Sequence, residues 1–240
     1  ASTKMRIVVP LGFSVVAPGE LTSIKTVGIG ESFTWESRQP LTEIQVVISR
    51  FFRRKFSDLK LPVTLFVTED FSQDPRPLVE EVVQMLDFFQ SEYGEHTWSE
   101  LNLVQVENVE LPSTGCAGLT LLDPAILQQP SSSRMELARR IARQWWGCSV
   151  QFAGPSDAWL ADGFATYAAL RYFQVKYPEE FSSQLAHQAV QALKYENQAP
   201  IRKGLELGIG SDEYKSVVSA KGAWVLYMLS QVVGNSKFNT

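Results

Sequence analysis

The hydrophobic pattern changes its period once along the chain, and this change limits the possible folds most strongly. Between residues 5 and 56, short runs rich in Val, Ile, Phe and Thr alternate with turn signals built on Pro and Gly. Such runs are typical of β-strands. The pattern predicts consecutive antiparallel strands at "MRIVVP", "FSVVAP", "SFTWES" and "IQVVISRFF", and a further strand at "LPVTLFVTED".

Helical periodicity starts after these strands. Apolar residues recur about every 3.6 positions over residues 76–93, which predicts a helix of about five turns. Two more strands are expected at "LNLVQVENVEL" and "GLTLLDPAIL". Further helices are expected at 133–147, 157–176, 178–196 and 212–233. Strands first, then a mixed region, then helices indicate an α+β protein, with a β piece at 1–58 and an α+β domain at 59–240.

Composition limits the partners and the environment. The 240 residues carry 22 Lys and Arg against 26 Asp and Glu, so the net charge of −4 gives no general reason to expect nucleic acid or an anionic membrane. No apolar run approaches the roughly 18 residues of a membrane helix, and no signal peptide is evident, so we expect a soluble chain of unknown compartment. The two cysteines, Cys116 and Cys148, are too few for a disulfide framework; we expect half-buried thiols, with a single bridge between them as the alternative.

One helical window has the layout of a zinc site. Helical residues four apart share a face, so a His-Glu-x-x-His helix presents two imidazoles to one metal ion. The corresponding window here is Arg139, Arg140, Ile141, Ala142 and Arg143, and eighteen residues separate Arg143 from Asp162. Four segments of the chain resemble segments of the M1 family of zinc aminopeptidases, the gluzincins, and they occur in the family's order and at its spacing. These segments are "FTWESRQPL", "ELARRIARQWWG", "WLADGFATY" and "AKGAWVLYML".

This resemblance implies a fold and a division of the chain. It implies a thermolysin-like peptidase domain of mixed sheet and helices at 59–240, preceded by the C-terminal part of an M1-type β domain at 1–58. Members of the family also have a helical C-terminal domain, and the resemblance implies that this domain would follow the present sequence. We therefore expect the chain to be part of a larger protein or complex.

The departures from the family pattern fall on its functional positions. By position, the zinc ligands correspond to Arg139, Arg143 and Asp162, and the general base corresponds to Arg140. The amine-binding glutamate corresponds to Gly115 in "PSTGCAGL", and the oxyanion-stabilising tyrosine corresponds to Ser219. A guanidinium is cationic and has no lone pair for a metal ion. We therefore expect no zinc and no catalytic residue, and a pseudo-peptidase that binds a protein or peptide.

Two other functions remain open at this stage. Arg139, Arg140 and Arg143, with Arg53, Arg54 and Lys55, could form an anion- or nucleic-acid-binding module, although nucleic acid is the less expected partner. An active metal-dependent aminopeptidase with an atypical site is the other alternative.

The arginines themselves also have two interpretations. They could form an ordinary solvated helix face, with one favourable pair between Glu136 and Arg140. Alternatively, if the two helices pack as the resemblance implies, Arg139 and Arg143 point at Asp162 and form a binding cluster with it, joined by salt bridges, while Arg140 leans toward Glu136 or solvent.

Overall fold

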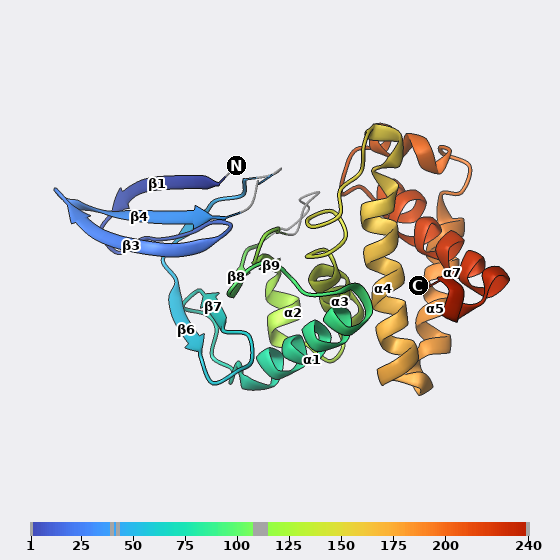
Figure 1. Cartoon of the computed structure of the whole chain (residues 1–240), viewed down its shortest axis with the longest axis horizontal. Coiled ribbons are helices and arrows are strands. Elements are labelled where there is room, and N and C mark those ends of the chain that lie inside the picture. Colours follow the sequence, from blue (N-terminus) through green and yellow to red (C-terminus); the bar gives the residue numbers. More distant parts are fainter. Residues whose placement is uncertain (1, 39–40, 42–43, 108–114, 239–240) are drawn as a thin grey trace. The chain divides into compact units, whose positions relative to one another are not determined.

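The computed structural model of the protein describes residues 2–38, 41, 44–107 and 115–238. The chain forms two compact units (Figure 1). Of the described residues, unit 1 comprises 2–38, 41, 44–83, 97–107 and 115–130, and unit 2 comprises 84–96 and 131–238. The division passes through a helix, and the sequence boundary near residue 58 stays a prediction.

Unit 1 contains the strands. An antiparallel sheet has the order β1-β4-β3, formed by β1 (Thr3–Pro10), β3 (Glu20–Val27) and β4 (Gly30–Ser37). Two short strands, β2 (Ser14–Val16) and β5 (Val47–Ser49), pair antiparallel. Their shared core includes Val16, Phe33 and Trp35. The predicted run of antiparallel strands is confirmed for these elements, but β3 was not predicted.

A second, mixed sheet in unit 1 has the order β6-β7-β8-β9. Its strands are β6 (Phe52–Phe56), β7 (Val63–Val67), β8 (Leu101–Gln105) and β9 (Leu119–Leu122). The β6 strand pairs antiparallel with β7, whereas β7, β8 and β9 are parallel. Every residue of these three strands is buried, as expected for parallel strands covered on both faces.

Two predicted elements of this region are corrected. The run "GLTLLDPAIL" is a strand only to Leu122, because Pro124 starts the short helix α2 (Pro124–Gln128) at a position where proline is favoured. The basic run Arg53-Arg54-Lys55, expected between strands, lies inside β6. Helix α1 (Arg76–Tyr93) has the predicted bounds.

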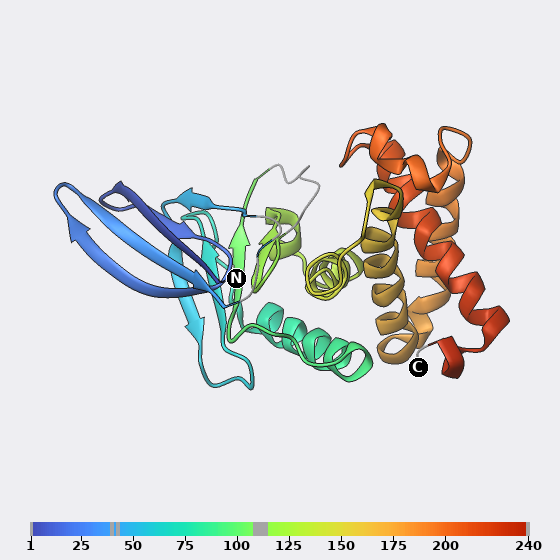
Figure 2. The same cartoon turned by 45° about the horizontal axis from the view of Figure 1, so that its top comes forward.

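Unit 2 is a helical assembly. It contains α3 (Arg134–Ala142), α4 (Trp159–Lys176), α5 (Pro178–Lys194) and α7 (Lys221–Val233), with the short helices α6 (Asp212–Tyr214) and α8 (Asn235–Phe238). Two 3-10 helices, η1 (Pro155–Asp157) and η2 (Ile201–Leu207), and a π-helical segment at Lys215–Ala220 complete it. Helix α4 packs against α3, α5 and α7 (Figure 2).

A glycine pair sets the crossing of α4 and α7. A Cβ at Gly163 would lie 3.3 Å from the Cα of Gly222, and a Cβ at Gly222 would lie 3.1 Å from the Cα of Gly163. The two backbones therefore meet without side chains between them. This contact fixes the first turn of α4, which carries Asp162, against the helix that follows the π-helical segment.

Two composition-based expectations change with the structure. Both cysteines are disulfide-bonded, so the expectation of free thiols is wrong. The span Asp212–Val233 is one helix long and apolar enough to cross a membrane by length and composition, contrary to the expectation that no such run exists. In its most apolar stretch of 18 residues, 44% of the residues are buried, and the core helices of soluble proteins meet the same criteria, so this is weak evidence for a membrane span.

Candidate functional site: an ionic network on three helices

The ends of two helices place the charged residues of the site. Arg139 and Arg140 stand in the last turn of α3, Arg143 caps that helix, and Asp162 lies in the first turn of α4. Cations at a helix C-terminus and anions at a helix N-terminus are both favoured by the helix dipole. Each helix end therefore carries the sign of charge that its own dipole stabilises.

Asp162 lies at the centre of this network and is only 4% exposed. Its Oδ1 accepts a hydrogen bond from Arg143 Nη1 at 2.8 Å and a longer one from Arg139 Nη1 at 3.4 Å. The Tyr214 hydroxyl, at the end of α6, donates to Oδ2 at 2.8 Å. The predicted bridge from both arginines to Asp162 is present, and it joins α3, α4 and α6 through one carboxylate.

Glu136 organises the other side of the arginines. Arg139 donates to it through Nε at 2.7 Å and through Nη2 at 2.6 Å, while Arg140 Nε donates to Oε1 at 2.7 Å. Arg140 thus leans toward Glu136, which is one of the two predicted directions, rather than toward solvent. Arg139, by contrast, pairs more closely with Glu136 than with Asp162, because two parallel bonds to one carboxylate match the guanidinium fork.

The charges shift the titration of these groups. Burial acts to raise the pKa of Glu136, but the guanidinium groups of Arg139 and then Arg140 outweigh it and lower that pKa to about 2. The Arg139 pKa is raised, because the attraction of Glu136 and Asp162 outweighs its own burial. Burial, followed by the adjacent Asp162 carboxylate, raises the pKa of Tyr214, so this hydroxyl stays a protonated donor.

The interpretation of the arginines as a solvated helix face is wrong. Arg140 is 4% exposed, Arg143 is 8% exposed and Gln144 is fully buried. Buried guanidinium groups need partners, and Glu136 and Asp162 supply them. The polar face of α3 therefore packs against other residues of unit 2 instead of pointing into solvent.

The residues at the four family positions do not fit a zinc ion. Zinc in proteins is bound by neutral imidazole, thiolate or carboxylate, and three of the four positions carry guanidinium groups. The remaining oxygen donor, Asp162, already accepts hydrogen bonds on both oxygens. Over the described part of the chain, no three His, Cys, Asp or Glu side chains gather into a group that could hold a metal ion.

Gly115 belongs to unit 1 and has a backbone that excludes a side chain. Its φ is +111°, and a Cβ built there would lie 2.1 Å from the carbonyl oxygen of Leu119. The glutamate of the family pattern therefore cannot be accommodated on this backbone. Residues 112–114 of the same motif lie outside the described residues.

Sequence reasoning missed Tyr214. The family pattern pointed to Ser219, which lies within the π-helical segment, whereas Tyr214 immediately precedes that segment and reaches Asp162. A π-helical turn inserts residues relative to an α-helix and changes which side chains share a face. In the sequence, Tyr214 stands five residues before Ser219, and this spacing gave no reason to assign Tyr214 to the site.

The comparisons with known proteins agree with this fold. The family model described as Peptidase family M1 domain matches residues 78–240. Endoplasmic reticulum aminopeptidase 2 from Homo sapiens is 24% identical over 198 residues, covering 76% of this chain and 21% of that protein. The Bos taurus protein of the same name is 25% identical over 191 residues, covering 73% and 20%. The chain thus spans about a fifth of these relatives.

Solved structures share the architecture across the chain. An M1 zinc metallopeptidase from Deinococcus radiodurans has a TM-score of 0.75 at 20% identity, covering 99% of this chain and 54% of that one. A mutant M1 zinc metallopeptidase from the same organism, bound to a Tyr-Ser-Ala substrate, gives 0.74 at 20% identity with the same coverage. These matches establish the predicted α+β fold: antiparallel strands, then a mixed sheet with helices.

Proposed function

Because the chain belongs to peptidase family M1, we propose that it is a member of that family that does not hydrolyse peptides and instead binds a protein or peptide partner. The observation that carries the proposal is the ionic network: the position of each zinc ligand is held by a residue that is paired with another residue of the chain. A metal ion at this place would have to displace buried ion pairs and meet two guanidinium groups.

The expected loss of activity follows from the missing groups. A catalytic zinc ion polarises the carbonyl and activates the attacking water, and each oxyanion donor typically contributes about 2.7–4 kcal/mol. The chain has Arg140 in place of the general base and Ser219 in place of the tyrosine donor. Neither can perform the corresponding step, because one is a permanent cation and the other has a shorter side chain.

A binding role is supported by the way in which the helices are held. The carboxylate of Asp162 joins α3, α4 and α6, so these helices have a fixed link that needs no metal ion. The fold is kept along nearly the whole chain while the chemistry of the site is replaced. A rigid scaffold that presents a surface is the role for which this combination is suited.

The anion- and nucleic-acid-binding alternative has less support. Arg139, Arg140 and Arg143 already pair with Glu136 and Asp162, which leaves little free positive charge for phosphate groups. The net charge of −4 also opposes binding to the negatively charged phosphate backbone of a nucleic acid.

Metal content and aminopeptidase activity together test the proposal. The purified protein, prepared without added metal, is analysed by inductively coupled plasma mass spectrometry and assayed on aminoacyl-4-nitroanilides and short peptides. We expect far less than one zinc ion per chain, no turnover, and a melting temperature unchanged by chelator. Near-stoichiometric zinc with turnover that is lost on Asp162→Ala would overturn the proposal.

A reversion variant sharpens this test. Restoring Arg139→His, Arg140→Glu, Arg143→His and Asp162→Glu is expected to recover zinc binding, because α3 and α4 already bring the first, third and fourth positions together. Turnover is expected to stay at least about a hundredfold below that of an active relative, because Gly115 and Ser219 still lack the amine anchor and the oxyanion donor. Robust turnover by this variant would show that these two positions matter little.

A further inference from the structure

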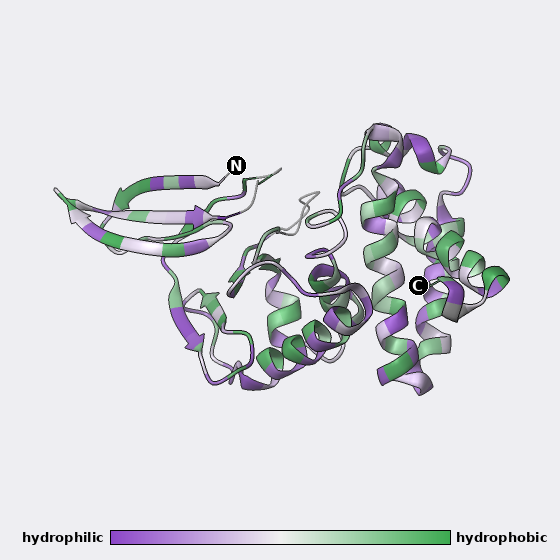
Figure 3. Cartoon of the chain, viewed as in Figure 1, coloured by the Kyte–Doolittle hydropathy of each residue, from purple (hydrophilic) through white to green (hydrophobic). Residues whose placement is uncertain are grey.

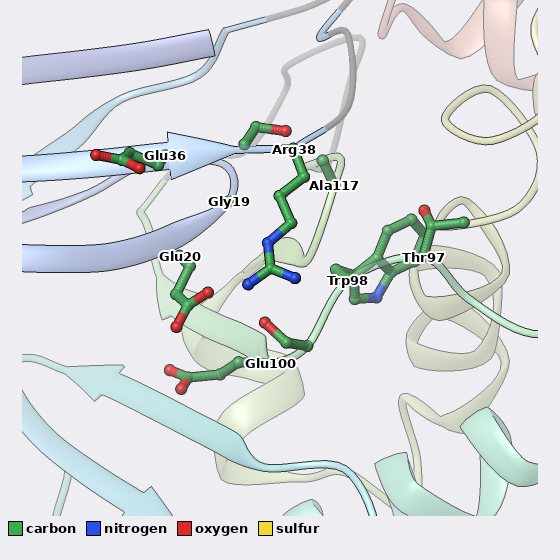
Figure 4. A pocket seen from close by; sticks show the side chains of 10 residues that line it. Gly19, Glu20, Glu36, Arg38, Thr97, Trp98, Glu100 and Ala117 are labelled. Atoms are coloured by element: carbon green, nitrogen blue, oxygen red, sulfur yellow. The ribbon is translucent and has the colours of Figure 1, made fainter. Parts of the chain in front are cut away.

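A pocket within unit 1 lies apart in sequence from the ionic network and shares no residue with it (Figure 4). Its cavity volume is about 80 Å³, and it opens to solvent. Four segments line it: the start of β3, the end of β4, the residues just before β8, and the turn before β9. The lining residues used below are Glu20, Glu36, Arg38, Trp98 and Glu100.

Close backbone packing builds the pocket. A Cβ at Gly19 would lie 2.5 Å from the carbonyl oxygen of Glu36, and the Gly19 amide donates to the Ala117 carbonyl at 3.1 Å. A Cβ at Gly118 would lie 3.3 Å from the Trp98 side chain. Both glycines have positive φ, +100° and +81°. The lining segments are therefore held against one another by backbone contacts that a larger residue would break.

The charges in the pocket divide into paired and unpaired groups. Glu36 forms an ion pair with Lys4 at 2.8 Å, and Glu100 is held by Lys55 at 2.5 Å and by the Thr64 hydroxyl at 2.9 Å. Glu20 and Arg38, in contrast, form no ion pair with each other or with any other described residue. One anion and one cation therefore line the same pocket with their charges available.

The arrangement of these groups defines the ligand. Figure 4 shows the Arg38 guanidinium extending into the pocket between Glu20 and Trp98. A guanidinium binds a carboxylate through paired hydrogen bonds, a carboxylate binds an ammonium group, and an indole face accepts an apolar side chain. We propose that this pocket binds a free α-amino acid zwitterion, with its carboxylate on Arg38, its ammonium group on Glu20 and its apolar side chain against Trp98.

Isothermal titration with L-phenylalanine tests the assignment on the whole chain. We expect saturable binding with a dissociation constant of about 1 mM or tighter, a strength reasonable for a ligand of this size. Phenethylamine lacks the carboxylate and 3-phenylpropionate lacks the ammonium group, so each is expected to bind at least about tenfold more weakly.

Matched variants separate the pocket from the rest of the surface. Arg38→Gln is expected to weaken L-phenylalanine binding at least about tenfold, and this variant should no longer bind L-phenylalanine more tightly than phenethylamine. Glu20→Gln should no longer bind L-phenylalanine more tightly than 3-phenylpropionate. Arg54→Gln and Glu69→Gln, exposed residues of unit 1 outside the pocket, are the controls and should bind like the parent.

The outcomes are decisive in both directions. The assignment would be refuted if L-phenylalanine showed no saturable binding up to about 20 mM, a concentration well above the expected dissociation constant. It would also be refuted if Arg38→Gln and Glu20→Gln left the binding of L-phenylalanine unchanged. Both variants change exposed side chains, and unchanged circular dichroism melting curves would show that the variants remain folded. Because the zinc and activity measurements concern unit 2, either proposal can fail while the other stands.

Discussion

Two basic runs of this chain have similar composition and opposite environments. Arg139, Arg140 and Arg143 lie at the end of α3 and pair with the half-buried Glu136 and the buried Asp162. Arg53, Arg54 and Lys55 lie on β6, an edge strand whose residues 52–55 are all exposed and which is visibly hydrophilic in Figure 3. Lys55 pairs with Glu100, and the Arg53 guanidinium lies 6.0 Å from the ring centroid of Phe66.

The difference teaches that a basic run has no fixed meaning until its neighbours are known. On α3, Arg140 and Arg143 are buried and Arg139 is partly buried, and each pairs with Glu136 or Asp162. Removing one member of such a pair leaves the charge of the other uncompensated. On β6, water solvates the charges, and basic side chains on an edge strand also discourage pairing with other chains. The first run holds helices together, whereas the second run contributes little to the free energy of unfolding.

The largest effect expected from this contrast comes from Asp162→Ala. Removing this carboxylate leaves two guanidinium groups near each other without their shared partner, which typically costs about 3–5 kcal/mol for a buried pair. Urea denaturation followed by circular dichroism measures the change. The control is Asp58→Ala, which breaks the exposed 2.8 Å pair with Arg76 and should cost much less than Asp162→Ala, because water screens an exposed pair.

A combined variant shows whether the cost comes from the stranded charge. Replacing Asp162 by Leu together with Arg139→Met and Arg143→Met removes all three charges at similar volume. This triple variant should be less destabilised than Asp162→Ala alone, because no unpaired charge remains buried. Equal losses in both variants would mean that the network acts through packing, and the contrast between the two basic runs would fail.

The next effect concerns the tyrosine. Tyr214→Phe removes one hydrogen bond to a buried charged carboxylate and keeps the ring in place. Hydrogen bonds to charged groups typically contribute about 1.5–3 kcal/mol, so the free energy of unfolding should fall by that amount. The matched control is Tyr177→Phe on the same helical unit, and a Tyr214→Phe loss no larger than that of the control would remove Tyr214 from the network.

A smaller effect appears as pH dependence. The folded pKa of Glu136 is about 2, below its ordinary value of 4.5, so Glu136 stabilises the fold above about pH 4.5 and this contribution is lost as the pH falls toward 2. With 38% of the Glu136 side chain exposed, we expect about 1 kcal/mol after solvent screening. Stability curves of the parent and of Glu136→Gln should converge as the pH approaches 2, and parallel curves would contradict the assignment.

The smallest effect is expected on β6. Arg54 forms no ion pair with any described residue, so Arg54→Gln should change the free energy of unfolding by less than about 0.5 kcal/mol. Thermal and urea denaturation measure this change alongside Asp162→Ala. A loss above about 1 kcal/mol would mean that the exposed run also carries structural charge pairs, and the two runs would no longer be distinct.

Local sequence determined most elements of the fold. The 3.6-residue period over residues 76–93 was sufficient for α1, and short runs rich in Val, Leu and Phe were sufficient for β7 and β8. Strand β3 was missed because its residues are mostly exposed and its sequence "ELTSIKTV" is polar. It is a strand because its backbone pairs with β4 over nearly its whole length, and that stabilisation comes from the partner rather than from its own side chains.

The candidate site divides in the same way. From the sequence, the resemblance to the family predicted that Arg139 and Arg143 meet Asp162, and helical spacing placed Glu136 within reach of Arg140. The Arg139–Glu136 pair lies three residues apart on α3 and agrees with helical spacing, although it was not predicted, whereas tertiary structure alone decided that Tyr214 completes the network. The reason is physical: contacts within one helix follow from its fixed period, whereas a contact between helices depends on how their backbones pack, which the π-helical segment and the Gly163–Gly222 crossing set here.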